Sequence, residues 1–289
     1  MASSNPPSSN SPTFLEQTAS MLSTAGAYLR LPALASTGVA AVLTSLLYFK
    51  QKALIYPSHM PPNARTEVPR PSQFGIKDFE ELVIPTNDGE KLSAFYIRGP
   101  RGNRNSDITY RGYGLSTGEP DESGLYTDAQ TAIEYLRARA ETSNHKLVVY
   151  GQSLGGAVAV KLVSKHQKHG DIAGLVLENT FLSMRKLIPS VIPPARYLTY
   201  LCHQVWPTDS VIHNVSVPIL FLSGLQDEIV PPNHMRQLYD LATASIKIWK
   251  PLPGGDHNSS VLEEGYFEAI SDFITSVTGD EKKADRQRL

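Results

Sequence analysis

The fold of this chain is decided by the stretch K-L-V-V-Y-G-Q-S-L-G-G, which runs from Lys146 to Gly156. Residues 146–150 are mostly apolar and partly β-branched, which predicts a buried strand. The pattern G-x-S-x-G follows over 151–155, and 157–165 has the helix formers and apolar spacing of a helix that packs on a sheet. A serine at a tight turn between a strand and a helix is typical of a nucleophile elbow.

Nucleophilic chemistry explains the residue types at this turn. A sharp turn projects the hydroxyl of Ser153 from the C-terminal edge of the sheet, so we expect this serine to be the nucleophile. The elbow also includes Gln152. We expect that glycine is required at positions 151 and 155, because a Cβ at Gly151 or Gly155 would clash where the strand and helix pass closely. The backbone N–H of Leu154 is the predicted oxyanion donor, because unpaired amides collect at a helix N-terminus.

Length and composition limit the class of protein. The chain has 289 residues, enough for one large α/β domain and an appendage, and its apolar and charged fractions are ordinary for a globular protein. The net charge of −1 gives no indication of a nucleic-acid partner. The single cysteine, Cys202, excludes an intrachain disulfide and argues against a metal cluster. We therefore predict no metal, no cofactor and no nucleic-acid binding.

The first part of the chain is predicted to lie outside the globular domain. Residues 1–30 are predicted to be disordered, since the first twelve are rich in Ser, Pro and Asn. Residues 31–50 include an uncharged stretch whose helical length, at about 1.5 Å per residue, matches a bilayer core of about 30 Å. This predicts a single-pass transmembrane helix in the endoplasmic reticulum or plasma membrane. The alternatives are a buried core helix and a mildly apolar N-terminal segment. Residues 51–73 are rich in proline, which predicts an extended linker.

Residues 74–278 alternate between strand-like and helix-like segments, which predicts an α/β domain with a mostly parallel central sheet flanked by helices. Residues 183–214 interrupt the alternation with prolines and aromatics, and are interpreted either as a cap over the pocket or as a packed surface insertion. Residues 279–289 form a charged tail that is predicted to be solvated. The predicted strands are 79–85, 91–98, 146–150, 172–177, 218–223 and 246–249, and the predicted helices are 128–137, 157–165, 232–241 and 261–275.

A serine nucleophile needs a base that accepts its proton. Among the eight histidines, His257 follows a late strand in a Gly-rich turn before the last helix, and is the predicted base. The imidazole needs a carboxylate that fixes its tautomer, and Asp227, which follows the strand 218–223, is the predicted partner. Glu228 and Glu178 are the alternatives. The chain order Ser, Asp, His is the order of the α/β-hydrolase fold.

Five motifs extend the pattern beyond the elbow: Y-R-G-Y-G-L-S-T-G at 110–118, V-V-Y-G-Q-S-L-G-G at 148–156, L-E-N-T-F at 177–181, D-E-I-V-P-P at 227–232 and G-G-D-H-N at 254–258. Together they resemble the membrane-anchored bud-emergence (Bem-type) branch of the α/β-hydrolases. The resemblance implies a single-pass membrane serine hydrolase that acts on a small-molecule or lipid acyl substrate. It also implies Ser153, Asp227 and His257 as the catalytic triad.

The chain departs from this family after the strand 91–98. The family continues there with a strand, a loop that begins with His-Gly, a helix and a further strand, whereas here the polar stretch 99–107 leads to Tyr110. Roughly thirty residues are absent, about the length of a strand–helix–strand crossover. We therefore expect a sheet that lacks one central strand–helix unit and a site that lacks the second oxyanion donor. Either 108–110 pairs directly with 146–150, or the domain is unstable because buried backbone groups stay unpaired.

These observations predict a membrane-anchored serine hydrolase that cleaves acyl esters or thioesters. In this hypothesis Ser153 attacks the carbonyl carbon, His257 transfers the proton and Asp227 orients His257. One alternative is a non-catalytic pseudo-hydrolase with a binding role, because the second oxyanion donor is missing. The other alternative is a truncated isoform whose domain is unstable. The sequence does not indicate an oligomeric state.

Overall fold

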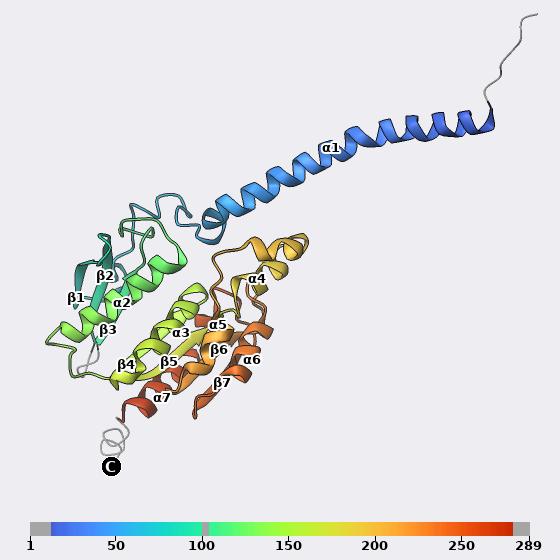
Figure 1. Ribbon diagram of the computed structural model, residues 1–289. Helices are drawn as coiled ribbons and strands as arrows, with labels where there is room; N and C mark the ends of the chain where they lie inside the picture. Colours follow the sequence, from blue (N-terminus) through green and yellow to red (C-terminus); the bar gives the residue numbers. More distant parts are fainter. Residues whose placement is uncertain (1–12, 100–103, 280–289) are drawn as a thin grey trace, which may run out of the picture. The chain divides into compact units, whose positions relative to one another are not determined.

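The computed structural model describes residues 13–99 and 104–279, and the chain divides into two units between Lys50 and Gln51. Helix α1 (Phe14–Ile55) provides all the regular structure described in the first unit (Figure 1). The structure thus places residues 14–30 in a helix where the sequence predicted disorder, because Ala, Leu, Met and Gln favour a helix there. Residues 1–12 and 280–289, predicted to be disordered and solvated, lie outside the described residues.

The transmembrane helix expected over 31–50 is not supported. Over the residues that the structure describes, no helix contains a stretch that is both long enough and apolar enough to cross a membrane. Ser36, Thr37 and Ser45 lower the apolar character of this stretch.

Two separate β-sheets form the centre of the second unit. The first is antiparallel in the order β1 (Phe79–Pro85), β2 (Lys91–Arg98), β3 (Arg104–Thr109). The second is parallel, with its four strands adjacent in chain order. Its strands are β4 (Leu147–Gln152), β5 (Ile172–Glu178), β6 (Ile219–Gly224) and β7 (Lys247–Leu252).

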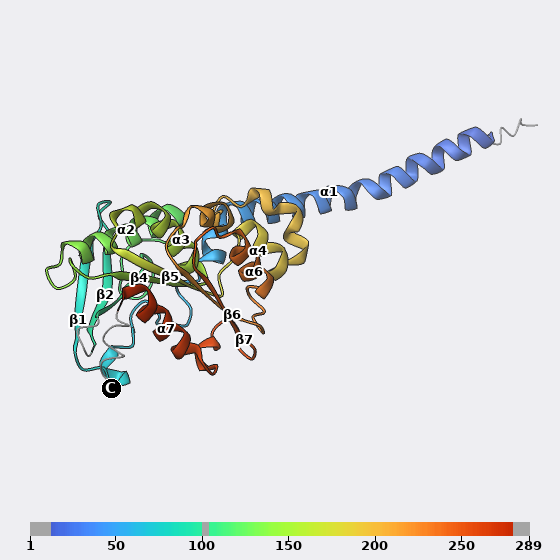
Figure 2. The ribbon, with the colours of Figure 1, turned by 90° about the horizontal axis from the view of Figure 1, so that it is seen from below.

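Helices cover both faces of the parallel sheet. Figure 2 shows α2 (Glu122–Ala138) and α3 (Leu154–His166) on one side and α7 (Tyr266–Thr278) on the other. The face of α3 is also covered by α6 (Pro232–Leu241). The shorter elements are η1 (Pro71–Phe74), η3 (Gln167–His169), α4 (Met184–Val191), η4 (Pro193–Leu201), α5 (Thr208–Val211), η5 (Ile212–Asn214) and η6 (Ser260–Leu262).

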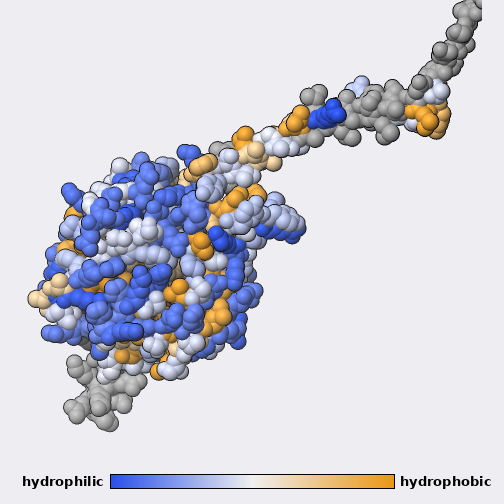
Figure 3. All heavy atoms as spheres, viewed as in Figure 1, coloured by the Kyte–Doolittle hydropathy of each residue, from blue (hydrophilic) through white to orange (hydrophobic). Residues whose placement is uncertain are grey.

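The hydrophobic core follows the two-residue period of the strands. In β6, Phe221 packs with residues of α3 and α6, whereas its neighbours Leu220 and Leu222 pack with Tyr266 and Phe273 of α7. Strands covered on both faces are continuously apolar, and β6 is buried along its whole length. The visible surface of this unit is mainly hydrophilic with scattered hydrophobic residues (Figure 3).

Strand β3 differs from the sequence-based expectation. The polar stretch 99–107 was expected to connect directly to Tyr110, but Arg104–Thr109 pairs with β2, with Ile108 opposite Ala94. The hypothesis that 108–110 pairs with 146–150 is therefore wrong: in the described ranges, β3 pairs only with β2, and β4 only with β5. Alternation between Ile108 and its polar neighbours suits a strand with one covered face, which explains the pairing.

A cavity of about 210 Å³ lies between β3 and β4, which do not pair with each other. Residues of both strands line it together with side chains of α2 and α3, among them Ala132 and Ala159. Every residue of β4 from 147 to 150 is partly or fully exposed, while β5 and β6 are almost fully buried. This incomplete burial fits the expected loss of one strand–helix unit beside the elbow strand.

Arg111, in the motif at 110–118, ties three segments together beside this cavity. Its Nε donates to Asp128 Oδ1 of α2 at 2.8 Å, and its backbone N–H donates to Asp128 Oδ2 at 2.7 Å. Its Nη1 and Nη2 donate to the two carboxylate oxygens of Asp88, in the β1–β2 turn, at 2.7 and 3.0 Å. The hydrogen bonds from Arg111, then that from Thr86, hold the pKa of Asp88 at about 2, below its ordinary 3.8.

The substitution Ala132→Leu tests the cavity. A leucine there fills empty space, so we expect the free energy of unfolding in urea to rise by about 0.5–2 kcal/mol. The control is Ala157→Leu, at a buried position of α3 outside the lining of the cavity, which should lower it by about 1–3 kcal/mol through overpacking. Destabilisation of similar size by both substitutions would show that the space between the sheets is already filled.

The acid stability of the domain tests the Arg111 network. Because the pKa of Asp88 is lower in the folded than in the unfolded chain, this carboxylate contributes stability that is present above pH 3.8 and is lost as the pH falls towards 2. In Asp88→Asn we expect a smaller decrease of the free energy of unfolding over that window than in the wild type. Asp78→Asn, at an exposed carboxylate 3.5 Å from Arg98, is the control that should keep the wild-type decrease. An Asp88→Asn curve parallel to the wild type contradicts the assignment.

Candidate active site

The elbow has the strained geometry that the sequence predicts. Strand β4 ends at Gln152, α3 begins at Leu154, and Ser153 between them has a φ of 52°, in the region that L-residues rarely adopt. A Cβ added at Gly151 would lie 2.3 Å from the carbonyl oxygen of Gly155, so a glycine is required there.

The expected reason for Gly155 is wrong. A Cβ at Gly155 would have no atom within 4 Å, because it would point into open space. The second position that requires a glycine is Gly156, where a Cβ would lie 2.6 Å from the side chain of Thr180. In the G-x-S-x-G pattern, the close strand–helix crossing therefore requires a glycine at Gly151 only. Gly156, just after the pattern, is required by the contact with Thr180, which follows β5.

The three residues predicted as a triad lie in one hydrogen-bonded series. Ser153 Oγ lies 3.0 Å from His257 Nε2, and His257 Nδ1 lies 2.7 Å from Asp227 Oδ2. The Asp227 carboxylate is buried, and its Oδ1 accepts the backbone N–H groups of Ile229 and Val230 at 2.9 and 2.8 Å. A buried, hydrogen-bonded carboxylate on one ring nitrogen and a serine hydroxyl on the other is the arrangement that activates a serine.

The alternative carboxylates have other positions. Glu178 Oε2 accepts hydrogen bonds from the hydroxyls of Tyr150 and Tyr266, each at 2.6 Å. Burial raises the pKa of both tyrosines most, and the hydrogen bonds to Glu178 raise it further. Both hydroxyls therefore stay protonated and act as hydrogen-bond donors. Glu228 lines the pocket beside His257 without an ion pair to it among the described residues. The geometry therefore favours Asp227 as the partner of the imidazole.

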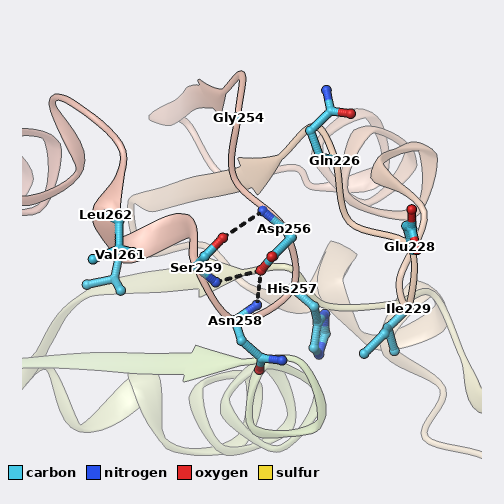
Figure 4. A pocket seen from close by; sticks show the side chains of 10 residues that line it. All are labelled: Gln226, Glu228, Ile229, Gly254, Asp256, His257, Asn258, Ser259, Val261 and Leu262. Atoms are coloured by element: carbon cyan, nitrogen blue, oxygen red, sulfur yellow. Dashed lines mark hydrogen bonds between the residues drawn. The ribbon is translucent and has the colours of Figure 1, made fainter.

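The turn that carries His257 is built around Asp256. Its Oδ1 accepts hydrogen bonds from the backbone N–H groups of Asn258 and Ser259 at 2.8 and 2.7 Å (Figure 4). The bond from Asn258, and after it those from Ser259, lower the pKa of Asp256 below its ordinary value. Gln152 Nε2 donates to the carbonyl oxygen of His257 at 2.7 Å, so the elbow itself holds the turn. Asp256 acts in the turn, as its sequence context indicates, and lies outside the Ser–His–Asp series.

An open pocket of about 670 Å³ lies beside His257 (Figure 4). It is lined by polar groups and by the apolar side chains of Ile229, Val261 and Leu262. Ser153 is not among its lining residues, but His257 lines the pocket and its Nε2 lies 3.0 Å from Ser153 Oγ. The lining residues are Gln226, Glu228, Ile229, Gly254, Asp256, His257, Asn258, Ser259, Val261 and Leu262.

Residues 183–214, predicted as a cap or as a packed insertion, are partly buried in the core. None of the residues that line the pocket beside His257 belongs to this segment. Its Met184, Leu187 and Trp206 are buried in a cluster with core residues of α2 and α3, and Trp206 Nε1 donates to the hydroxyl of Tyr56 at 2.9 Å. These three side chains therefore serve packing, whereas Tyr197 and Tyr200 of the same segment are exposed.

The structure shows the position of one of the two predicted oxyanion donors. The N–H of Leu154 is the first amide of α3, directly after Ser153, where helix amides lack intrahelical acceptors. A second donor usually comes from the loop after an earlier strand of this fold. That region corresponds to the break between β3 and β4, and residues 100–103 lie outside the described residues.

Sequence reasoning missed the two residues that follow β5. Asn179 bonds to the turn that carries His257, and Thr180 Oγ1 donates to the carbonyl oxygen of Ser153 at 2.6 Å. The motif L-E-N-T-F at 177–181 was their only signal, and it carried no indication of these contacts.

Comparison with known proteins identifies the family. The chain is 36% identical to the protein bem46 of Schizosaccharomyces pombe, over 85% of this chain and 93% of that protein. It is 39% identical to the uncharacterized membrane protein YNL320W of Saccharomyces cerevisiae, over 81% of this chain and 92% of that protein. The chain belongs to the Bem46-type α/β-hydrolase family. A family model described as serine aminopeptidase, S33, matches residues 107–211.

Solved structures confirm the fold of this Bem46-type chain. An α/β-hydrolase from Vibrio vulnificus superposes with a TM-score of 0.65 at 18% identity, over 78% of this chain and 94% of that chain. An esterase of Pyrococcus furiosus superposes with a TM-score of 0.60 at 13% identity, over 73% and 95%. At these identities the likeness shows the α/β-hydrolase fold alone.

The alignments with the fungal relatives have more positions than the residues of this chain that they cover. The match with bem46 runs over 280 positions, whereas 85% of 289 residues is about 246, so about 34 positions belong to the relative alone. This number agrees with the roughly thirty residues predicted to be absent, about the length of a strand–helix–strand crossover. In the structure the sheet of β3 and the sheet of β4 are separate, next to the part of the chain where the sequence predicts the absent unit.

Alanine at each elbow glycine separates the two steric environments. Gly151→Ala forces a Cβ against a backbone carbonyl, and we expect a loss of at least about 1–3 kcal/mol in the free energy of unfolding. Gly155→Ala meets open space inside a helix, and should be neutral or should stabilise by about 0.5–1 kcal/mol. Chemical denaturation of the two variants checks this, and a larger loss for Gly155→Ala than for Gly151→Ala would contradict the described elbow.

Proposed function

We propose that this Bem46-type chain is a serine hydrolase that cleaves acyl esters or thioesters. The observation that carries the proposal is the series from Ser153 Oγ through His257 to the buried carboxylate of Asp227. A pocket of mixed polar and apolar lining beside His257 offers room for the acyl or the leaving group. Esterases among the solved structures of the same fold agree with this reaction class.

In the proposed reaction, Ser153 Oγ attacks the carbonyl carbon of the substrate while His257 Nε2 takes the hydroxyl proton. The carbonyl oxygen becomes an oxyanion, which the N–H of Leu154 stabilises. His257 then returns the proton to the leaving alcohol or thiol, and an acyl-Ser153 remains. Water attacks this ester with His257 as the base, which releases the acid and restores the serine hydroxyl. No cofactor takes part in these steps.

The break in the sheet limits the expected rate. Loss of one oxyanion donor typically costs a factor of about 10²–10³ in rate. We therefore propose a slow hydrolase, acting on a small-molecule or lipid acyl substrate whose apolar part contacts Ile229, Val261 or Leu262. The membrane location stays a prediction, which the relative YNL320W supports because it is described as a membrane protein.

A non-catalytic binding protein is the second candidate, and the missing strand–helix unit favours it. Such a protein keeps the pocket and the hydrogen-bonded side chains without turnover. A third possibility, an unstable truncated chain, predicts no cooperative thermal transition.

A fluorophosphonate probe and a p-nitrophenyl ester test the hydrolase against these rivals. With the folded full chain we expect covalent labelling that Ser153→Ala abolishes, and ester turnover that His257→Ala lowers by more than about 10³-fold. His234→Ala, which alters a buried histidine outside the triad, is the control for histidine removal. Labelling without turnover selects the binding protein, and a cooperatively folded wild type that is not labelled overturns the proposal.

A further inference from the structure

The tripeptide Glu178-Asn179-Thr180, at the end of β5, touches all three segments that carry the proposed triad. The carbonyl oxygen of Glu178 accepts the backbone N–H of Ser153 at 2.8 Å, and Thr180 Oγ1 donates to the carbonyl oxygen of Ser153 at 2.6 Å. Both backbone polar groups of the strained serine are thus held by this tripeptide, and a serine with positive φ needs such support.

Asn179 holds the other two segments with its side-chain amide. Its Oδ1 accepts a hydrogen bond from the N–H of Gly224 at 2.8 Å. Gly224 is the last residue of β6, and the chain continues from it to Asp227. Its Nδ2 donates to the carbonyl oxygen of Asp256 at 3.1 Å and to Ser260 Oγ at 3.0 Å, on either side of His257. One buried amide therefore joins the strand before the acid to the turn that carries the base.

The environment of Asn179 indicates that this bridge is rigid. Asn179 is 1% exposed and has a φ of 45°, which Asn tolerates better than most L-residues. The His257 turn packs closely on the end of β6, since a Cβ at Gly224 would lie 2.6 Å from the carbonyl oxygen of Gly255 and from Ser260 Oγ. The oxygen of the amide accepts one hydrogen bond and its NH₂ group donates to both sides of the His257 turn, so rotation of this side chain leaves buried polar groups unpaired.

We propose that Asn179 is a positioning residue for the proposed hydrolysis, which fixes the His257 turn against β6 so that the imidazole meets Ser153 and Asp227 together. Asn179 contacts neither the imidazole nor the carboxylate of Asp227, and acts through the backbone of the turn. Displacement of a reacting group by about 1 Å can cost about 10²-fold in rate, so the loss of this bridge should lower turnover strongly. The expected effect of Asn179 on the rate rests on the proposed function. The expected effect of Asn179 on the hydrogen bond between His257 and Asp227 rests on geometry alone.

Two substitutions of Asn179 separate its backbone and amide roles. Asn179→Gly keeps the positive φ and removes the whole bridge. Asn179→Asp keeps the shape and the acceptor for Gly224 N–H, but places a carboxylate oxygen against the carbonyl of Asp256. The matched control is Gln167→Ala, because the amide of Gln167 also bridges two backbone groups, Asn214 O at 2.6 Å and Ser216 N–H at 2.8 Å, and Gln167 follows the end of α3 opposite to Ser153.

The first measurement is the downfield proton resonance of His257 Nδ1–H in the substrate-free full chain. We expect this resonance in the wild type and in Gln167→Ala, and its loss in both Asn179 variants. The second is turnover of p-nitrophenyl acetate, for which we expect kcat to fall about 10²-fold in both Asn179 variants with KM unchanged. A structural role alone would leave the resonance and kcat of the folded fraction intact.

Each outcome has a distinct meaning. Wild-type resonance and kcat in cooperatively folded Asn179 variants would overturn the inference, as would a wild type without the resonance. A wild type that shows the resonance but no turnover contradicts the proposed function and leaves the positioning role to be decided by the resonance. If both Asn179 variants fail to fold, Ser260→Ala, which removes one acceptor of the amide, should weaken the same resonance, and an unchanged resonance there would overturn the inference.

Discussion

The parallel pairing of β4, β5, β6 and β7 is the constraint on which the rest of the structure depends. Parallel strands bring their C-terminal ends to one edge of a sheet, so the turns after them converge although they are far apart in the sequence. Ser153 follows β4, Asn179 follows β5, Asp227 follows β6 and the His257 turn follows β7. The site is thus one consequence of strand order, and each of the four turns contributes one part of it.

The same dependence makes the break between the two sheets important. The elbow strand β4 has a paired neighbour on the β5 side only, within the described ranges, and a cavity lies on its other side. Its fixed position therefore comes from β5, from α3 and from the contacts of Ser153 with Glu178 and Thr180. The hydrogen-bonded series from Ser153 to Asp227 is complete despite this break, and the loop that usually supplies a second oxyanion donor is predicted to be absent there.

Local pattern predicted most of the fold. The expected bounds of β1, β2 and α6 agree with the structure, because alternation, a turn signal and a helix-starting proline are local features. Ser153, Asp227 and His257 were predictable from motif and chain order. The pairing of Arg104–Thr109, the role of Gly156 in place of Gly155 and the bridge made by Asn179 were not, since each depends on a neighbour distant in the sequence.

The central claim is that His257 and Asp227 make Ser153 a nucleophile. Rapid mixing of the full chain with excess p-nitrophenyl acetate, followed by mass spectrometry of quenched peptides, tests it most directly. We expect a burst of about one p-nitrophenolate per chain and an acetyl group on Ser153, because p-nitrophenolate is a better leaving group than the serine alkoxide released in deacylation. Linear release at the rate of the Ser153→Ala variant, with no acetylated Ser153 peptide, would contradict it.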